Sequence, residues 1–150
     1  MLKLFNTPHR RIEEFAPVAG NSVSLYTCGP TVYNHLTVGN WVAYIRWDTM
    51  VRTLQANSYD VTRVMNITDV GHLVSDADEG EDKMIKGARR EGMSMYDIAQ
   101  RYTDSFFEGM HTLNLLVPDH ITKATEYIPE QIELITRLEQ KGCTYVIEDG

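Results

Sequence analysis

The feature that most constrains the fold is a strand–helix–strand pattern in the first half of the chain. Residues 22–27 (SVSLYT) have the composition of a buried strand, and residues 59–67 (YDVTRVMNI) are rich in β-branched and aromatic side chains. Between them, apolar residues recur at helical spacing from about residue 38 to residue 56, at Val42, Ile45, Met50, Val51 and Leu54. Two strands joined through a helix form a βαβ unit with parallel strands and a right-handed crossover. The pattern therefore predicts an α/β fold built on a parallel sheet.

Further elements are expected after the second strand. Helical patterns extend over residues 81–91, 94–113 and 129–141. The second of these helices has one broad apolar face, formed by Tyr96, Ile98, Ala99, Tyr102, Phe106 and Met110. Residues 143–147 (CTYVI) have the composition of another strand, and the first twenty residues indicate irregular structure or short edge strands.

The composition indicates one globular domain. The 150 residues are 43% apolar and 23% charged, which is ordinary for a domain with a core. No apolar run approaches the roughly 18 residues that cross a bilayer, and the N-terminus lacks the apolar core of a signal peptide, so we expect a cytoplasmic protein. A net charge of −7 excludes a general nucleic-acid coat but not one specific RNA contact. The turn signal at residues 148–150 should lead to a partner strand, which we interpret as the mark of a fragment.

The residues that could carry chemistry follow the first strand. Cys28 and Cys143 are the two cysteines, and in a reducing compartment each is a free thiol, a metal ligand or a buried small side chain. Ligands of an open parallel sheet bind beyond the C-terminal ends of its strands, where Cys28 lies. Gly29 allows a close approach of the backbone to a ligand, and Gly39 and Asn40 fall near a helix start, where free N–H groups favour anions. These residues predict a thiol and an anion site over one cleft.

Four sequence blocks carry a resemblance to a known family. They are residues 28–33 (CGPTVY), 64–69 (VMNITD), 123–130 (KATEYIPE) and 141–146 (KGCTYV). In order and spacing they resemble the corresponding blocks of cysteinyl-tRNA synthetases. The resemblance implies a class I synthetase, with this chain as the N-terminal part of its Rossmann-like catalytic domain. Such an enzyme, expected to be monomeric, uses ATP with Mg²⁺ to convert L-cysteine to cysteinyl-adenylate and passes the cysteinyl group to tRNA(Cys). The isolated chain would be inactive.

The resemblance also implies roles for residues on the cysteine side of the site. Cys28 matches the family's first ligand of a Zn²⁺ ion that takes the substrate thiolate, and the other ligands lie far downstream in family members. A soft thiolate binds zinc well and a serine hydroxyl binds it poorly, so one coordination bond could select cysteine. Gly29 and Thr68 match the family's contacts to the substrate cysteine.

The ATP side is implied by an alignment with the family's signature His-Ile-Gly-His or His-Ile-Gly-Asn. The aligned residues are Thr37 to Asn40, so a threonine replaces the first histidine, and its hydroxyl can still bond a phosphate. Gly39 would let the adenine approach the backbone, and Asn40 would face ribose or phosphate. His35 is two residues out of register, and a surface position is the preferred interpretation over a role in the site. The role of His72 is left open.

Other patterns have simpler explanations. Residues 83–86 (KMIK) resemble the family's second signature, Lys-Met-Ser-Lys-Ser, but that signature lies far downstream in family members, and a solvated helix face is expected here. Residues 76–82 resemble a calcium loop, but their glycine is misplaced and the final bidentate acid is missing, so an acidic mobile loop is the preferred interpretation. Cys143 is interpreted as structural. Two alternatives stay open for the function: the cysteine ligase of mycothiol synthesis, and a short binding paralogue without catalytic activity.

Overall fold

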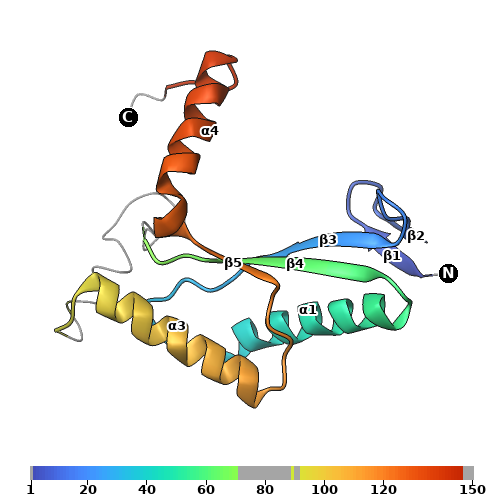
Figure 1. Cartoon of the computed structure of the whole chain (residues 1–150), viewed down its shortest axis with the longest axis horizontal. Coiled ribbons are helices and arrows are strands. Elements are labelled where there is room, and N and C mark those ends of the chain that lie inside the picture. The colour runs from blue at the N-terminus through green and yellow to red at the C-terminus, as the bar shows by residue number, and fades with distance from the viewer. Residues whose placement is uncertain (1, 71–88, 90–91, 147–150) are drawn as a thin grey trace.

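The computed structural model describes residues 2–70, 89 and 92–146, and its centre is a three-stranded parallel sheet (Figure 1). The strands are β3 (Ser22–Thr27), β4 (Asp60–Ile67) and β5 (His120–Lys123), in the order β3-β4-β5. Helix α1 (Val38–Ala56) connects β3 to β4, and Val23 pairs with Val61 in the parallel register. The strand–helix–strand prediction is therefore confirmed, and the chain has the α/β, Rossmann-like architecture expected of a parallel sheet with flanking helices.

The third strand is not where the sequence suggested. Residues 143–146 are exposed and have no regular structure, so the expected strand at 143–147 is wrong over its described part. The edge of β4 is instead taken by β5, whose four residues pair with the last four residues of β4. Asp119, just before β5, accepts a hydrogen bond from the backbone N–H of Arg63 at 2.7 Å. A strand of four residues carries too little periodicity to be found from its own sequence.

Helix α3 (Met95–Thr112) and α1 lie on the same side of the sheet and cover the core (Figure 1). Ser94 caps α3 by accepting a hydrogen bond from the N–H of Asp97 at 3.2 Å. The predicted apolar face of α3 is buried except for Tyr96, which is 77% exposed. The core cluster consists of Val32, Tyr44, Met65, Ile67, Ile98, Ala99, Tyr102, Phe106 and Met110.

The expected apolar face of α1 is only partly correct. Val51 and Leu54 are buried as predicted, but Val42 and Ile45 are exposed. They line, with part of α3, a groove on the surface between the two helices. Tyr44 and Asp48 are buried instead, so the face of α1 that meets the core includes a carboxylate that apolar spacing could not identify.

That buried carboxylate belongs to a polar network beneath the sheet. Asp48 accepts hydrogen bonds from the N–H of Leu116 at 2.7 Å and from Arg52 at 2.6 Å. The side chain of Arg63, which is 2% exposed, donates to Thr27 Oγ1 at 3.1 Å and to the carbonyl of Leu116 at 3.2 Å. Burial lowers the pKa of Arg63, and the nearby Asp48 and Asp119 oppose that shift. The network joins α1, β3, β4 and the segment before β5.

We expect Asp48→Ala to lower the free energy of unfolding by about 2 to 3 kcal/mol, because it leaves the partly buried N–H of Leu116 without this acceptor and removes a negative charge near a buried guanidinium. Urea denaturation followed by circular dichroism measures the effect. The matched control is Asp104→Ala on the exposed side of α3, where the carboxylate accepts a hydrogen bond from Gln100 at 2.7 Å, and the expected change is within about 0.5 kcal/mol. Equal effects of the two variants would contradict the structural role of Asp48.

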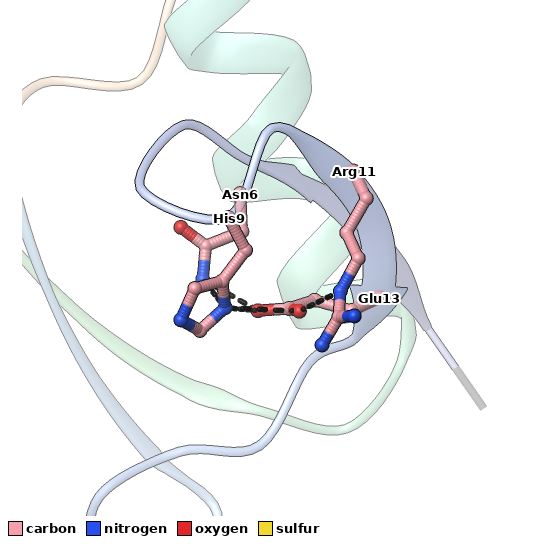
Figure 2. Close-up of polar contacts among 4 residues, drawn as sticks. All are labelled: Asn6, His9, Arg11 and Glu13. Atoms are coloured by element: carbon pink, nitrogen blue, oxygen red, sulfur yellow. Dashed lines mark hydrogen bonds and ion pairs between the residues drawn. The ribbon is translucent and has the colours of Figure 1, made fainter.

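The first strands form a separate hairpin where β3 and β4 begin (Figure 1). Strands β1 (Lys3–Asn6) and β2 (Arg11–Glu14) are antiparallel, which confirms short strands in this region. Figure 2 shows Asn6, His9 and Arg11 around the carboxylate of Glu13. These hydrogen bonds lower the pKa of Glu13, and their effect decreases in the order Asn6, His9, Arg11.

After β5 the chain forms a short 3-10 helix, η1 (Ala124–Tyr127), which leads into α4 (Ile128–Gln140). Helix α4 confirms the helix expected at 129–141 and extends away from the sheet (Figure 1). The helix expected at 81–91 lies outside the described residues except for Arg89. The patterns at 76–82 and 83–86, and His72, lie outside them altogether.

Candidate functional site

The candidate site lies where β3 and β4 end. The chain after β3 is fastened to the chain after β4 by a parallel bridge between Thr31 and Thr68. The N–H of Thr68 donates to the carbonyl of Pro30 at 2.9 Å, and the N–H of Val32 donates to the carbonyl of Thr68 at 3.1 Å. Residues 30–32 and residue 68 are therefore held together by backbone hydrogen bonds at the carboxyl edge of the sheet. Parallel sheets of this kind bind ligands at this edge.

Gly29 is required by the fold itself. A Cβ atom on Gly29 would overlap the backbone carbonyl of Asn66 in β4. The N–H of Gly29 also donates to the side-chain oxygen of Asn66 at 2.8 Å. The sequence suggested that this glycine allows a ligand to approach, whereas the closest neighbour in the structure is the adjacent strand. The close approach in the structure is therefore to the protein backbone, and an approach to a ligand stays a prediction.

A cavity of about 290 Å³ opens between the chain after β3 and the start of α1. Gly29, Thr31, Thr37, Asn40 and Tyr44 are among the residues that line it. The structure therefore brings Gly29 together with Thr37 and Asn40, two of the three residues expected to bind ATP. Cys28, Thr68 and Gly39 are not among the residues that line this cavity.

Cys28 is exposed at the end of β3 and lies near the buried ring of Tyr44. Burial, with a smaller contribution from the charge of Cys28, raises the pKa of Tyr44 to about 12. Tyr44 therefore keeps its proton at neutral pH. Cys143 is also exposed, so burial accounts for neither cysteine.

The N-terminus of α1 is closed by reciprocal side-chain bonds. Thr37 is the N-cap, and its Oγ1 accepts from the N–H of Asn40 at 3.4 Å. Asn40 Oδ1 accepts from the N–H of Thr37 at 3.0 Å and from its hydroxyl at 2.7 Å. This capping box satisfies groups that a helix start leaves without partners. Two residues aligned to the ATP signature thus have a structural role in the protein without ligand.

Gly39, between them, has no such structural explanation. Within the described part of the chain, a Cβ atom there would meet Thr37 Oγ1 alone, at an ordinary contact distance of 3.7 Å. Glycine is a poor residue for a helix, since it costs ~1 kcal/mol relative to alanine in a helix interior. The open space beside Gly39 is the feature that packing does not explain.

His35 lies at the wall of the same cavity. Its ring packs edge-to-face against Tyr102, with 5.0 Å between ring centroids, and its Nδ1 is 3.3 Å from Ser105 Oγ. These contacts attach the loop before α1 to α3. His35 is exposed, as expected, and it also lines the cavity of the candidate site.

Zinc would need more ligands than the described part of the chain gathers. Residues 2–70, 89 and 92–146 contain no cluster of three or more His, Cys, Asp or Glu side chains suited to a metal. Cys28 can contribute one soft donor at the cleft, and a zinc site needs at least three protein ligands. The described residues can therefore supply one of the ligands that such a site needs.

Within the described residues, no helix is long and apolar enough to cross a membrane.

Comparison with known proteins identifies the family. Residues 14–150 match the model of the class I (C) tRNA synthetase catalytic domain. The chain belongs to this family. It is 50% identical to the cysteine–tRNA ligase of Treponema denticola over 145 residues, which are 97% of this chain and 30% of that protein. It is 48% identical to cysteine–tRNA ligase 1 of Burkholderia lata over 149 residues, which are 99% of this chain and 32% of that protein.

A third relative, the cysteine–tRNA ligase of Novosphingobium aromaticivorans, is 47% identical over 149 residues, again 99% of this chain and 30% of that protein. The chain therefore spans about a third of the length of the curated relatives it matches. The resemblance drawn from the four sequence blocks is confirmed. The parallel sheet with its flanking helices is the architecture expected for a catalytic domain of this family.

Proposed function

We propose that the protein containing this chain activates L-cysteine with ATP and transfers the cysteinyl group to tRNA(Cys). The observation that carries the proposal is the similarity to cysteine–tRNA ligases over nearly the whole chain. The chain would form the N-terminal part of a larger catalytic domain, since it spans about a third of those relatives. The remaining substrate contacts would come from outside these 150 residues, and the chain by itself would be inactive.

The nucleotide would bind at the start of α1. The open space beside Gly39 supports an approach of the adenine to the backbone there, and the helix N-terminus favours the phosphates of ATP with its Mg²⁺. Asn40 and the hydroxyl of Thr37 would bind ribose or phosphate by exchanging their mutual hydrogen bonds for bonds to the ligand. Threonine would serve in place of the usual histidine because it also caps the helix.

The cysteine would bind on the opposite side of the cleft. Gly29 and Thr68 would contact the amino acid, and Cys28 would provide one ligand of a Zn²⁺ ion completed by residues from elsewhere in the protein. When bound, zinc would supply a Lewis acid that prefers a thiolate to a hydroxyl. Selection of cysteine over serine would follow from that preference.

The test is ATP–pyrophosphate exchange by the complete protein with cysteine or serine as the amino acid. We expect exchange with cysteine, at least about 100-fold less with serine, and loss of exchange after zinc is removed by a chelator. Cys28→Ser should lose both zinc and cysteine activation, because the hard hydroxyl is a poor zinc ligand. Zinc content is measured on the same samples.

The matched control is Cys143→Ser, which changes the other exposed thiol and should leave zinc content and exchange unaltered. Thiol labelling adds a second readout: Cys28 should react freely in the 150-residue chain, which should hold little zinc, and should be protected in the complete protein. Stoichiometric zinc beside a freely labelled Cys28 would show that this cysteine is not a ligand.

The acceptor substrate separates the proposal from its alternatives. A cysteine ligase of mycothiol synthesis would activate cysteine but transfer it to an amino sugar, and a binding paralogue would show no exchange. Aminoacylation of tRNA(Cys) with labelled cysteine is the deciding measurement.

A further inference from the structure

Asn66, near the end of β4, forms side-chain hydrogen bonds to residues of β3, of the turn after β3 and of the segment after β4. Its Oδ1 accepts from the N–H of Gly29 at 2.8 Å and from the hydroxyl of Tyr26 at 2.9 Å. Its Nδ2 donates to Thr68 Oγ1 at 3.1 Å. One side chain therefore contacts the two residues proposed to bind cysteine, from a position that the sequence alone did not single out.

The orientation of this amide is fixed by its partners. A backbone N–H can only donate, so the atom that faces Gly29 must be the amide oxygen. The amide nitrogen then faces Thr68, whose hydroxyl must accept that hydrogen bond. The proton of the Thr68 hydroxyl consequently points away from Asn66.

The bond between Gly29 and Asn66 is made across neighbouring strands. The two residues are 37 positions apart in sequence, and no other described residue accepts from the N–H of Gly29. The backbone of Asn66 also fills the space next to the Gly29 Cα. Asn66 therefore holds the turn at Cys28 and Gly29 in two ways, through its side-chain hydrogen bond and through its backbone contact.

Sheet stability alone does not account for an asparagine here. Asparagine is depleted in strands, where β-branched and aromatic residues pack better. The side chain is only partly buried, yet both of its polar atoms are engaged with residues at the cleft. Its contacts serve the relative placement of two segments more than the core.

We propose that Asn66 is a positioning residue for cysteine binding, which holds Gly29 and Thr68 at a fixed separation through its amide. This role rests on the proposed function, because it presumes that cysteine occupies this edge of the cleft. Asn66 acts through Gly29 and Thr68 and does not itself need to contact the substrate.

The experiment compares Asn66→Ala and Asn66→Asp in the complete protein. Asn66→Ala removes all three hydrogen bonds, so we expect the KM for cysteine in pyrophosphate exchange to rise about 10- to 100-fold, with a smaller effect on the KM for ATP. Asn66→Asp keeps an acceptor for Gly29 and Tyr26, and the Thr68 hydroxyl can turn to donate to the carboxylate. It should recover a KM within about threefold of the wild type.

A readout independent of activity is hydrogen exchange at the amide of Gly29. It should become at least about 10-fold faster in Asn66→Ala and return toward the wild-type rate in Asn66→Asp. The matched control is Asn21→Ala at the other end of β3, where the amide bonds to the carbonyl of Ser58 at 3.3 Å. That variant should change neither the KM for cysteine nor the exchange at Gly29.

The outcomes are distinct. An unchanged KM for cysteine in Asn66→Ala, or a KM raised equally in Asn21→Ala, would overturn the positioning role. The proposed function would still stand in that case, provided that the wild-type protein is active. Wild-type protein without cysteine-dependent exchange would overturn the proposed function and this role together. If Asn66→Ala does not fold, Asn66→Ser is measured instead, and a normal KM for cysteine in that variant would equally overturn the role.

Discussion

Replacement of Gly29 by alanine is expected to lower the free energy of unfolding by about 3 kcal/mol. The added methyl group would overlap the backbone carbonyl of Asn66 in β4, and a strand backbone cannot move aside as the end of a flexible side chain can. The turn after β3 would have to shift away from β4. That shift would lengthen the hydrogen bond between Gly29 and Asn66 and strain the bridge between Thr31 and Thr68. Urea denaturation of this chain, followed by circular dichroism, measures the loss.

The matched control for this change is Gly39→Ala. Its new Cβ atom would make an ordinary contact with Thr37 Oγ1 at 3.7 Å, and alanine favours a helix more than glycine does. We expect an unfolding free energy that is unchanged or up to about 1 kcal/mol higher. If Gly29→Ala proves as well tolerated as Gly39→Ala, the close contact between β3 and β4 at Gly29 is wrong.

The second large effect is expected on activity rather than on folding. Gly39→Val should reduce cysteine-dependent pyrophosphate exchange by the complete protein about 100-fold, through a higher KM for ATP, because its side chain would enter the space proposed for the adenine. The fold should persist, since among the described residues a Cβ atom at this position meets Thr37 Oγ1 alone within 4 Å, and valine is no worse than glycine in a helix. Thermal denaturation of the same sample checks this.

The companion variant is Thr37→His, which restores the histidine usual in the family. Because Thr37 is the N-cap of α1, we expect a loss of about 1 kcal/mol in unfolding free energy but retained exchange activity. Full activity in Gly39→Val would remove the case for a nucleotide at the start of α1. A Gly39→Val protein that no longer folds would show instead that the glycine serves packing.

The sequence predicted the βαβ unit because each of its elements has a strong local pattern. The β-branched run before residue 67 and the helical spacing after residue 38 are properties of short windows. The position of β5 could not be predicted in the same way. It is four residues long, and its pairing with β4 depends on contacts such as that between Asp119 and Arg63.

The candidate site shows the same division. Sequence blocks indicated Cys28, Gly29 and the start of α1 as the chemically important segments, and the family they suggested is confirmed. The sequence could not show why Gly29 must be a glycine, because the carbonyl that excludes a side chain belongs to a residue far along the chain. Nor could apolar spacing identify Asp48, whose burial depends on an N–H supplied by Leu116, 68 positions away.

By itself, then, the sequence determined the βαβ unit with β3 parallel to β4, and the family of the protein. Those properties follow from local periodicity and from short motifs of fixed spacing. Only the tertiary structure decided that Asn66 links Gly29 to Thr68 and that Thr37 and Asn40 bond to each other. Hydrogen bonds and steric exclusion act over about 3 Å, so they depend on the register of neighbouring strands, which local patterns do not specify.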